Sequence, residues 1–355
     1  MTAVHVVVPD GIDDPARPSG GNAYDRHVCR GLSALGWSVH EHSVPGCWPR
    51  HDAASFAALA GVVQRIPDDA VVLLDGLVAS TAPEVLVPQA RRLRLVVLVH
   101  MPLGHLPRDD RADDAQGRER LVLSSAVAVV ATSAWTRRRL LELYALRADR
   151  VHVAEPGVDA ADLATGTAAE GALLCVAAVT FDKGHDLLLG ALETVLDLSW
   201  QCVCVGRLDR DPAFVEGLRR RLLDGGLGDR VCFAGPRTGA GLDRTYAAAD
   251  LVVLASRAET YGMVVTEALA RGLPVVAAEV GGLTEALGYG PNGIRPGLLV
   301  PPDDPAALGV ALRAWLIDAE LRGRLRRAAR ARRESLLRWS TTASVLAGVL
   351  AGAAR

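Results

Sequence analysis

The chain has 355 residues, which is long for one hydrophobic core and sufficient for two domains. Half of the residues are hydrophobic but only 4% are aromatic, so the apolar content is mostly Ala, Val and Leu, as in parallel α/β layers. The formal net charge of −2 argues against a general nucleic-acid binder, and we expect no nucleic-acid partner.

Hydropathy and cysteine usage indicate the compartment. No run of eighteen apolar residues is present and the N-terminus lacks a basic segment, so we expect no signal peptide, no membrane span and at most peripheral membrane contact. The cysteines form no CxxC pair, and we interpret them as small buried hydrophobic residues of a reducing, cytoplasmic protein. They are Cys29, Cys47, Cys175, Cys202, Cys204 and Cys232.

The first half of the chain alternates short apolar runs with helical patterns. The predicted strands are residues 4–9, 37–44, 71–76, 95–100, 126–133 and 151–153, and the clearest predicted helices are 22–35 and 135–144. The charged stretch 108–120 is predicted to be a mobile loop. This alternation of strands and helices is typical of a parallel sheet with helices on both faces.

Two features of this half are candidate ligand contacts. Gly20 and Gly21 follow the first strand and precede a helix, as in a loop that cradles phosphate, although the full GxGxxG or P-loop pattern is absent and an ordinary turn is the alternative. His100 stands at the carboxyl end of its strand, where open α/β sheets place ligands. A structural, hydrogen-bonded histidine is the alternative there.

A small, polar run at 160–171 marks the predicted domain boundary, after which the strand–helix rhythm restarts. The predicted strands are 172–180, 201–206, 231–235, 251–254, 275–278 and 297–300, and the predicted helices include 187–198, 212–223 and two between 305 and 337. We therefore predict two doubly wound domains, 1–158 and 171–337, that face each other across a cleft.

The stretch 256–267 is the centre of the second domain. A buried strand precedes it and helical spacing follows it, so its loop leads into a helix N-terminus, which is a ready anion site. Gly262 allows the backbone to approach a ligand closely. Glu259 lies in the loop and Glu267 on the helix, and a ribose diol is a natural partner for the second carboxylate. In the alternative, Glu259 only caps the helix and Glu267 is solvated.

Lys183 is the single lysine of the chain, since all the other Lys and Arg residues, of 39 in total, are Arg. It lies in the predicted loop 181–186 between a strand and a helix. A composition that keeps one Lys indicates a position that needs a compact ammonium, although chance survival of one surface Lys is the alternative.

These motifs together resemble the retaining nucleotide-sugar glycosyltransferases of the GT-B fold, specifically glycosyltransferase family 4. Glu259 and Glu267 look like that family's E-x7-E motif. Glu155-Pro156-Gly157-Val158-Asp159 is similar to its interdomain signature, Asp182-Lys183-Gly184 to its phosphate-lysine loop, and Gly281-Gly282-Leu283-Thr284-Glu285 to its glycine turn. The resemblance covers nearly the whole chain and is strongest over 150–302.

The resemblance implies a role for each matching residue. Lys183 would hold the diphosphate, Glu267 the ribose hydroxyls and Glu259 the transferred sugar. His100 would also meet the sugar, and the last helix, 339–350 within the returning segment 338–355, would pack on the N-terminal domain. The amides at the start of the helix that follows Gly262 would receive the diphosphate and sugar. The backbone after the predicted strand 231–235 would meet the base, and the glycine-rich loop of the N-terminal domain would close on the diphosphate. These further donor-binding positions are Gly262, Met263, Val264, Val265, Pro236, Arg237, Gly20 and Gly21.

One departure concerns the arginine that the family usually places five residues before the lysine. Ala178 stands there instead, and Arg207 at the end of the neighbouring strand is our candidate replacement. The triplet Asp209-Arg210-Asp211 matches the D-x-D pattern of metal-dependent enzymes, but we interpret it as a solvated turn before a helix. We expect no metal and no cofactor beyond the sugar nucleotide.

The predicted function is therefore transfer of a sugar from a UDP- or GDP-linked donor to a hydroxyl of an unidentified small-molecule, glycan or lipid acceptor. The acceptor is expected to bind mainly to the N-terminal domain. A nucleotide-sugar epimerase on the same scaffold is the alternative enzyme, and a non-catalytic nucleotide-sugar binding protein is the alternative from another class.

Overall fold

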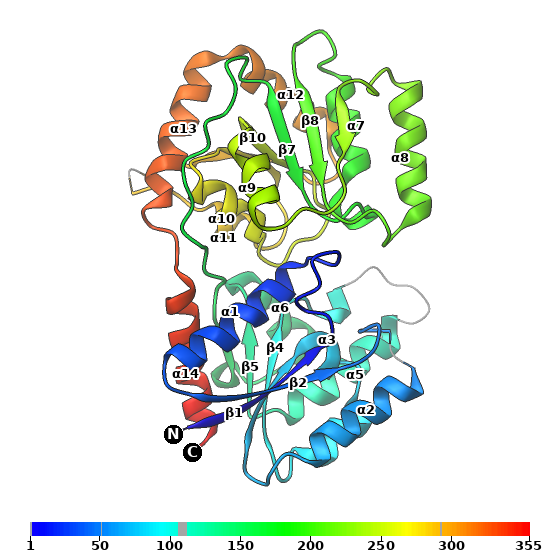
Figure 1. Ribbon diagram of the computed structural model, residues 1–355, viewed down its shortest axis with the longest axis vertical. Helices are drawn as coiled ribbons and strands as arrows, with labels where there is room; N and C mark the ends of the chain where they lie inside the picture. Colours follow the sequence, from blue (N-terminus) through cyan, green and yellow to red (C-terminus); the bar gives the residue numbers. More distant parts are fainter. Residues whose placement is uncertain (1, 51, 106–111, 292) are drawn as a thin grey trace. The chain divides into compact units, whose positions relative to one another are not determined.

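The computed structural model describes residues 2–50, 52–105, 112–291 and 293–355. The chain forms two compact units (Figure 1): unit 1 comprises Met1–Asp13, Ser19–Gly157 and Leu337–Arg355, and unit 2 comprises Asp14–Pro18 and Val158–Leu336. The expected domains were 1–158 with 338–355, and 171–337; the short segment Asp14–Pro18 was not foreseen in the second unit.

The segment between the expected domains packs on unit 2. The backbone N–H of Thr165 donates to the carbonyl of Ala247 at 3.0 Å, and the Thr167 hydroxyl donates to Asp250 at 2.6 Å. Asp250 is buried, so the bond from Thr167 helps to satisfy a carboxylate that burial would otherwise destabilise.

Unit 1 contains one parallel sheet of six strands in the order β2-β1-β3-β4-β5-β6. Its central strands are buried on both faces, which explains their continuous runs of Val and Leu. The chain runs outward from β1 to β2 and then returns to β3 on the other side, so the strand order reverses between β1 and β3. The strands are β1 Ala3–Pro9, β2 Ser38–Val44, β3 Val71–Asp75, β4 Arg94–Val99, β5 Ala128–Ala131 and β6 Val151–Val153.

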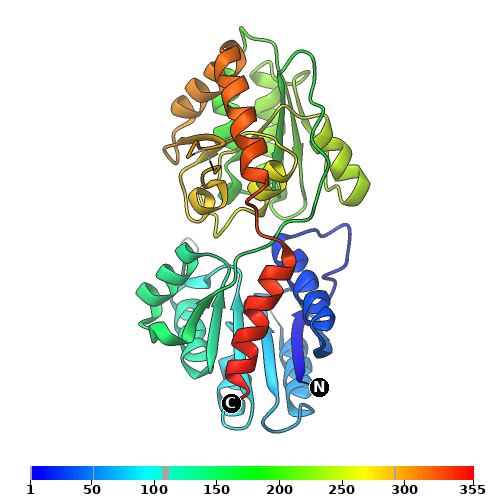
Figure 2. The same ribbon diagram turned by 90° about the vertical axis from the view of Figure 1, so that its left-hand side faces the viewer.

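Helices cover both faces of this sheet. The last helix, α14, lies beside α1 and against the strands (Figure 2), with Leu346 and Leu350 fully buried. Gly31 of α1 permits this approach, because a Cβ there would meet the Cβ of Ala343. The helices are α1 Gly20–Ala34, α2 Ala53–Gln64, α3 Gly76–Ala79, α4 Pro83–Gln89, α5 Ala112–Ser125, α6 Ala134–Tyr144 and α14 Trp339–Ala353, with 3-10 turns at Leu103–His105 and Ala148–Arg150.

Unit 2 repeats the plan with the strand order β12-β11-β10-β7-β8-β9, all parallel. The order reverses between β7 and β10, and their carboxyl ends lie side by side. Such a reversal of strand order is called a switch point, and open α/β sheets bind ligands at the carboxyl ends of the strands beside it. The strands are β7 Ala172–Val176, β8 Gln201–Val205, β9 Val231–Phe233, β10 Leu251–Leu254, β11 Val275–Ala278 and β12 Gly297–Val300.

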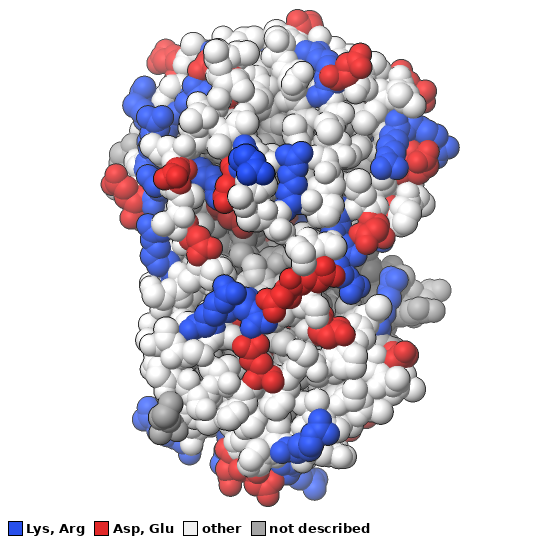
Figure 3. Space-filling model, viewed as in Figure 1, with Lys and Arg blue, Asp and Glu red and all other residues white. Residues whose placement is uncertain are grey.

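The helices of unit 2 enclose a core that includes the fully buried Trp315 and Tyr246. They are α7 His185–Glu193, α8 Pro212–Asp224, α9 Gly239–Ala247, α10 Met263–Ala270, α11 Leu283–Leu287, α12 Pro305–Ile317 and α13 Ala319–Arg333, with a 3-10 turn at Phe181–Lys183. Among the described residues, no helix is both long and apolar enough to cross a membrane. On the face drawn in Figure 3, basic and acidic side chains are interspersed over both units.

Three expectations about local structure were wrong. Residues 112–120 belong to helix α5 rather than to a mobile loop, and 108–111 lie outside the described residues. We predicted a loop because the stretch is rich in charged residues. In the fold these charges have partners, since Arg118 pairs with Glu84 at 2.6 Å and the buried Glu119 accepts a hydrogen bond from Ser80. Helix α7 ends at Glu193, earlier than expected. Two of the six cysteines, Cys47 and Cys232, are exposed rather than buried.

Candidate active site

The loop after β7 presents Lys183. A 3-10 turn, Phe181–Lys183, ends at Gly184, which has φ +66° and leads directly into α7. A Cβ at Gly184 would overlap the carbonyl oxygen of Ala255, just after β10. Only glycine therefore lets this loop lie against the segment that follows β10, and this contact brings the two loops of the switch point together.

Lys183 is paired with Glu259. Its Nζ donates to Glu259 Oε1 at 2.8 Å, and Asp182 Oδ2 lies 3.5 Å from the same nitrogen. Burial alone lowers the pKa of Lys183, but the carboxylates of Glu259 and Asp182 outweigh it, so the pKa of Lys183 is raised and the ammonium stays charged. The Lys183 and Glu259 side chains remain 23% and 17% exposed. A ligand can therefore reach both.

The glycine turn holds the loop that carries Glu259. The N–H of Gly282 donates to the carbonyl of Glu259 at 3.0 Å, and Gly281 has φ +55°. A Cβ on Gly281 would overlap the Glu259 carbonyl oxygen. The turn that the sequence singled out as a motif thus fixes the backbone of the loop before α10.

Helix α10 begins without a side-chain cap. Its N-cap residue is Gly262, with φ +92°, which has no side chain to accept a hydrogen bond from the first amides. Glu259 pairs with Lys183, so the alternative that Glu259 merely caps this helix was wrong. The amides of Met263 and Val264 therefore stand at the positive end of the helix dipole. The loop that leads into them carries the Glu259 that pairs with Lys183, an arrangement that suits an anion.

Glu267, one turn into α10, has a partner that the sequence did not reveal. The hydroxyl of Tyr246, on α9, donates to Glu267 Oε2 at 2.8 Å. Burial raises the pKa of Glu267, while Tyr246 and Arg271 oppose that shift. The guanidinium of Arg271 lies 4.5 Å from the centre of the Tyr246 ring. Glu267 is therefore half-buried and hydrogen-bonded rather than simply solvated.

Arg207 and Arg237 come from the ends of β8 and β9. Arg207 donates two hydrogen bonds of 2.9 Å to Asp209, so its guanidinium is already committed, and its role as a replacement arginine stays a prediction. Asp211 accepts from the Phe214 N–H and caps α8, as expected of a turn before that helix. The Arg237 guanidinium donates to Thr245 at 2.6 Å.

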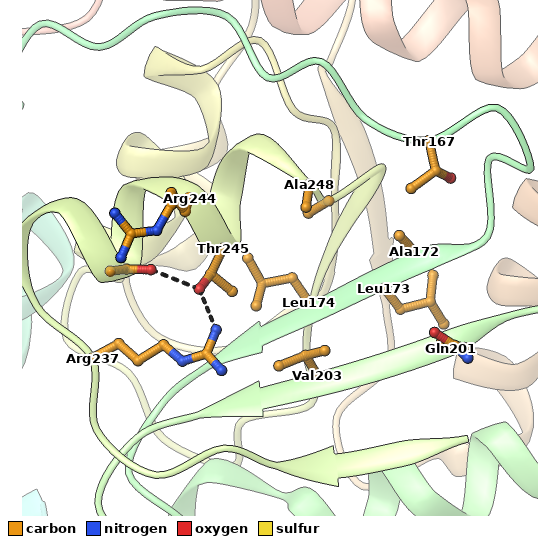
Figure 4. Close-up of a pocket in the computed structure, with 12 residues that line it drawn as sticks. Thr167, Ala172, Leu173, Leu174, Gln201, Val203, Arg237, Arg244, Thr245 and Ala248 are labelled. Carbon is orange, nitrogen blue, oxygen red and sulfur yellow. Dashed lines mark hydrogen bonds between the residues drawn. The ribbon is translucent and has the colours of Figure 1, made fainter. Parts of the chain in front are cut away.

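Arg237 also lines a hollow of about 520 Å³ between α9 and the β7–β8 face of the sheet (Figure 4). The strand residues that line it, such as Ala172 and Gln201, come from the amino-terminal part of β7 and β8, and much of the remaining lining comes from α9 and the residues after it. Of the predicted site residues, only Arg237 borders it. The hollow therefore lies apart from the Lys183–Glu259 pair at the carboxyl ends.

In unit 1, the predicted residues also gather at a switch point. Gly20 and Gly21 belong to the first turn of α1, capped by Ser19, rather than to a glycine-rich loop before the helix as we expected. A Cβ on Gly21 would lie 3.3 Å from Cδ2 of His100. His100 follows β4, and its Nε2 lies 2.9 Å from Asp25 Oδ1 and 3.5 Å from Asp75 Oδ2.

Comparisons with known proteins agree with this architecture. The model described as "Glycosyltransferase Family 4" matches residues 3–162, and the one described as "Glycosyl transferases group 1" matches 170–318. A D-inositol 3-phosphate glycosyltransferase from Jonesia denitrificans is 34% identical over 253 residues, 66% of this chain and 58% of the relative. The chain thus spans less than two thirds of that relative's length.

Two solved structures are similar over 99% of this chain. Sucrose-phosphate synthase from Thermosynechococcus elongatus is 22% identical, matches over 99% of its own chain and has a TM-score of 0.80. Anabaena HepE, solved in complex with UDP and glucose, is 18% identical, matches over 100% of its chain and has a TM-score of 0.77. At these identities the likeness establishes the fold.

Proposed function

We propose, from the premise that this chain belongs to glycosyltransferase family 4, that it transfers a sugar from a nucleotide-diphosphate sugar to an acceptor hydroxyl. The observation that supports this most is the pairing of Lys183 with Glu259 beside the uncapped start of α10, at the switch point of unit 2. An ammonium, free helix amides and two carboxylates suit a diphosphate, a sugar and a ribose.

The proposed roles divide the reaction between these groups. As the sugar–phosphate bond breaks, negative charge grows on the departing diphosphate, and Lys183 and the first amides of α10 stabilise it. Glu267 accepts hydrogen bonds from the ribose hydroxyls, and Glu259 from the transferred sugar. Pro236 and Arg237 lie at the base, Gly20 and Gly21 at the diphosphate, and His100 at the sugar.

We propose a retaining reaction through front-face attack, with the leaving phosphate assisting the acceptor hydroxyl. Glu259 is held by Lys183 at 2.8 Å, which favours an orienting role for its carboxylate over that of a nucleophile. The donor is UDP- or GDP-linked. Neither a metal ion nor a further cofactor takes part, since lysine and amides supply the positive charge.

The acceptor class that we propose is a phosphorylated polyol or sugar. The Jonesia relative is named for inositol 3-phosphate, and it is 34% identical to this chain. An acceptor of this class would carry both a reactive hydroxyl and an anionic group.

The experiment is a transfer assay with UDP- and GDP-sugars, each with inositol phosphate or hexose phosphates, following nucleoside diphosphate release and product mass. Release that requires an acceptor, with a glycosylated phosphate product of retained anomeric configuration, is the expected result. Conversion of donor into another sugar nucleotide without acceptor would instead identify an epimerase. Binding of donor without any turnover would indicate a non-catalytic binding protein.

A further inference from the structure

Three side chains from three elements of unit 1 meet at the point where its strand order reverses. Asp25 lies on α1, Asp75 ends β3, and His100 follows β4, which pairs with β3 in parallel. His100 Nε2 is 2.9 Å from Asp25 Oδ1 and 3.5 Å from Asp75 Oδ2. One ring nitrogen therefore faces two carboxylates.

The surroundings fix the ring of His100. The Tyr24 ring packs edge-on against it, with centroids 5.2 Å apart, and the Tyr24 hydroxyl is anchored to the carbonyl of Ala154 at 2.9 Å. Gly21 of α1 also packs against the His100 ring. A Cβ on Gly21 would lie 3.3 Å from Cδ2 of His100, so glycine leaves just enough space for the ring. A ring held in this way cannot easily turn to exchange its two nitrogens.

The carboxylates are desolvated and incompletely paired. The side chains of Asp25 and Asp75 are only 3% and 4% exposed. Asp75 Oδ1 accepts from the N–H groups of Leu77 and Val78, whereas Asp25 Oδ2 has no hydrogen-bond partner in the described residues. Two buried carboxylates this close to one imidazole are stable only if positive charge or a proton is retained among them.

The direction of the pKa shifts agrees with this geometry. Burial lowers the pKa of His100, but Asp25 and then Asp75 outweigh it, so the pKa of His100 is raised above 6.5. Burial and the neighbouring Asp25 raise the pKa of Asp75. Among the described residues, the titratable groups against the ring are Asp25 and Tyr24 of α1 and Asp75 of β3; burial raises the pKa of Tyr24, which stays neutral.

We propose that Asp25 and Asp75 are positioning residues that hold His100 as an imidazolium, with Nε2 bound to the carboxylates and Nδ1–H left to donate to the sugar nucleotide. Within the described residues, the hydrogen bonds of the ring all involve Nε2. His100 then acts as a charged hydrogen-bond donor and not as a general base. This inference rests on the proposed function for the identity of the ligand, but the protonation state of the ring does not.

The test is an NMR titration of the histidine rings in the whole chain, with the His100 signal assigned by its loss in His100→Gln. The expected midpoint for His100 in the unaltered protein lies above 6.5. Asp25→Asn is expected to lower it by about one pH unit or more, since a charge within hydrogen-bonding distance shifts a pKa by roughly 1–3 units. Asp75→Asn should lower it as well.

The matched control is Asp52→Asn, which exchanges the N-cap of α2 in the same unit and makes no contact with His100. It should leave the His100 midpoint unchanged. A midpoint at or below 6.5 in the unaltered protein, or one that Asp25→Asn does not move, would overturn the proposal. The midpoint of the unaltered protein can be measured even if the Asp25→Asn variant does not fold.

A kinetic readout separates this proposal from the proposed function. Asp25→Asn should reduce kcat at least tenfold while affinity for the nucleoside diphosphate stays within about twofold of the unaltered protein, since Lys183, the proposed charged contact of the diphosphate, lies in unit 2. An unchanged kcat would contradict the positioning role even if the ring titrates as expected. If no donor is turned over at all, the proposed function fails, and the ring titration still decides the charge state.

Discussion

The Lys183 ammonium has a carboxylate partner before any diphosphate arrives. Glu259 Oε1 lies 2.8 Å from Nζ, and both side chains are largely but not fully buried. A diphosphate must therefore compete with Glu259 for the ammonium, or share it. If Glu259 turns toward the sugar as the diphosphate takes Lys183, donor binding and orientation of the sugar occur together.

This competition predicts opposite effects for the two glutamates. Glu259→Gln removes a negative charge beside Lys183, so affinity for the bare nucleoside diphosphate should stay the same or rise by a few-fold, while turnover falls. Glu267→Gln should weaken the diphosphate and the sugar nucleotide alike, because an amide keeps only one accepting oxygen for the ribose diol. Calorimetric titration and rate measurements on both variants test this. Equal losses of diphosphate affinity would contradict the assignment.

Glu267 also predicts a pH dependence of stability. Its folded pKa is raised above 4.5, so the native state binds the proton more tightly than the unfolded state. The stabilisation is present below pH 4.5 and is lost as pH rises through the raised folded value. The melting temperature of the unaltered protein should therefore fall relative to that of Glu267→Gln as pH rises over that window. A difference that stays constant would show that burial does not raise this pKa.

At the level of secondary structure, glycines allow the loops after β7, β10 and β11 to pack closely together. Gly184, Gly262 and Gly281 all have positive φ, and a Cβ at each would strike the neighbouring loop or helix. A residue with a side chain at any of these three positions would clash with its neighbours. The site thus depends on close backbone packing as much as on its charged side chains.

The element-scale prediction concerns Gly281→Ala. A left-handed conformation and the overlap with the Glu259 carbonyl should together cost about 2 kcal/mol or more and should displace the Glu259 loop. The matched control is Gly217→Ala within α8, where a Cβ meets no atom within 4 Å and helix propensity predicts a gain of about 0.5–1 kcal/mol. Thermal unfolding of both variants checks the difference. A Gly281→Ala protein as stable as the control would contradict the packing described.

The strands were predictable because each is a short apolar run bounded by turn residues, and the motif positions were predictable because they follow those strands. The partners across the fold were not. Tyr246 lies near the end of α9, where a buried phenol signals a polar partner, but only the fold identifies that partner as Glu267. Likewise Asp25 sits beside core positions of α1, and its contact with His100 depends on a sheet assembled from residues far apart in sequence.

At the scale of the whole molecule, the two-domain GT-B fold predicted from the sequence is confirmed by the match to sucrose-phosphate synthase, with a TM-score of 0.80. Helix α14 returns to unit 1, where it packs on α1. Each unit contains its own switch point, and each switch point holds one group of the predicted site residues.

The whole reaction is predicted to proceed without a divalent cation. In the proposed reaction, Lys183 and the amides of α10 would supply the positive charge that a metal provides in other enzymes, and Asp209 and Asp211 are engaged by Arg207 and by the start of α8. Transfer rates should be the same in excess chelator and in magnesium or manganese. Loss of activity in chelator that either metal restores would contradict this and would direct attention to the two aspartates.

Calorimetric titration with UDP and GDP shows whether unit 2 binds a nucleoside diphosphate through Lys183. One of the two should bind the unaltered protein, and Lys183→Ala should weaken that binding by about tenfold to a hundredfold, the effect of losing one charge-assisted hydrogen bond. Arg219→Ala, which removes an equal charge from the exposed face of α8, should leave it unchanged. Equal affinity in the unaltered and Lys183→Ala proteins, or no binding of either nucleotide, would contradict the account.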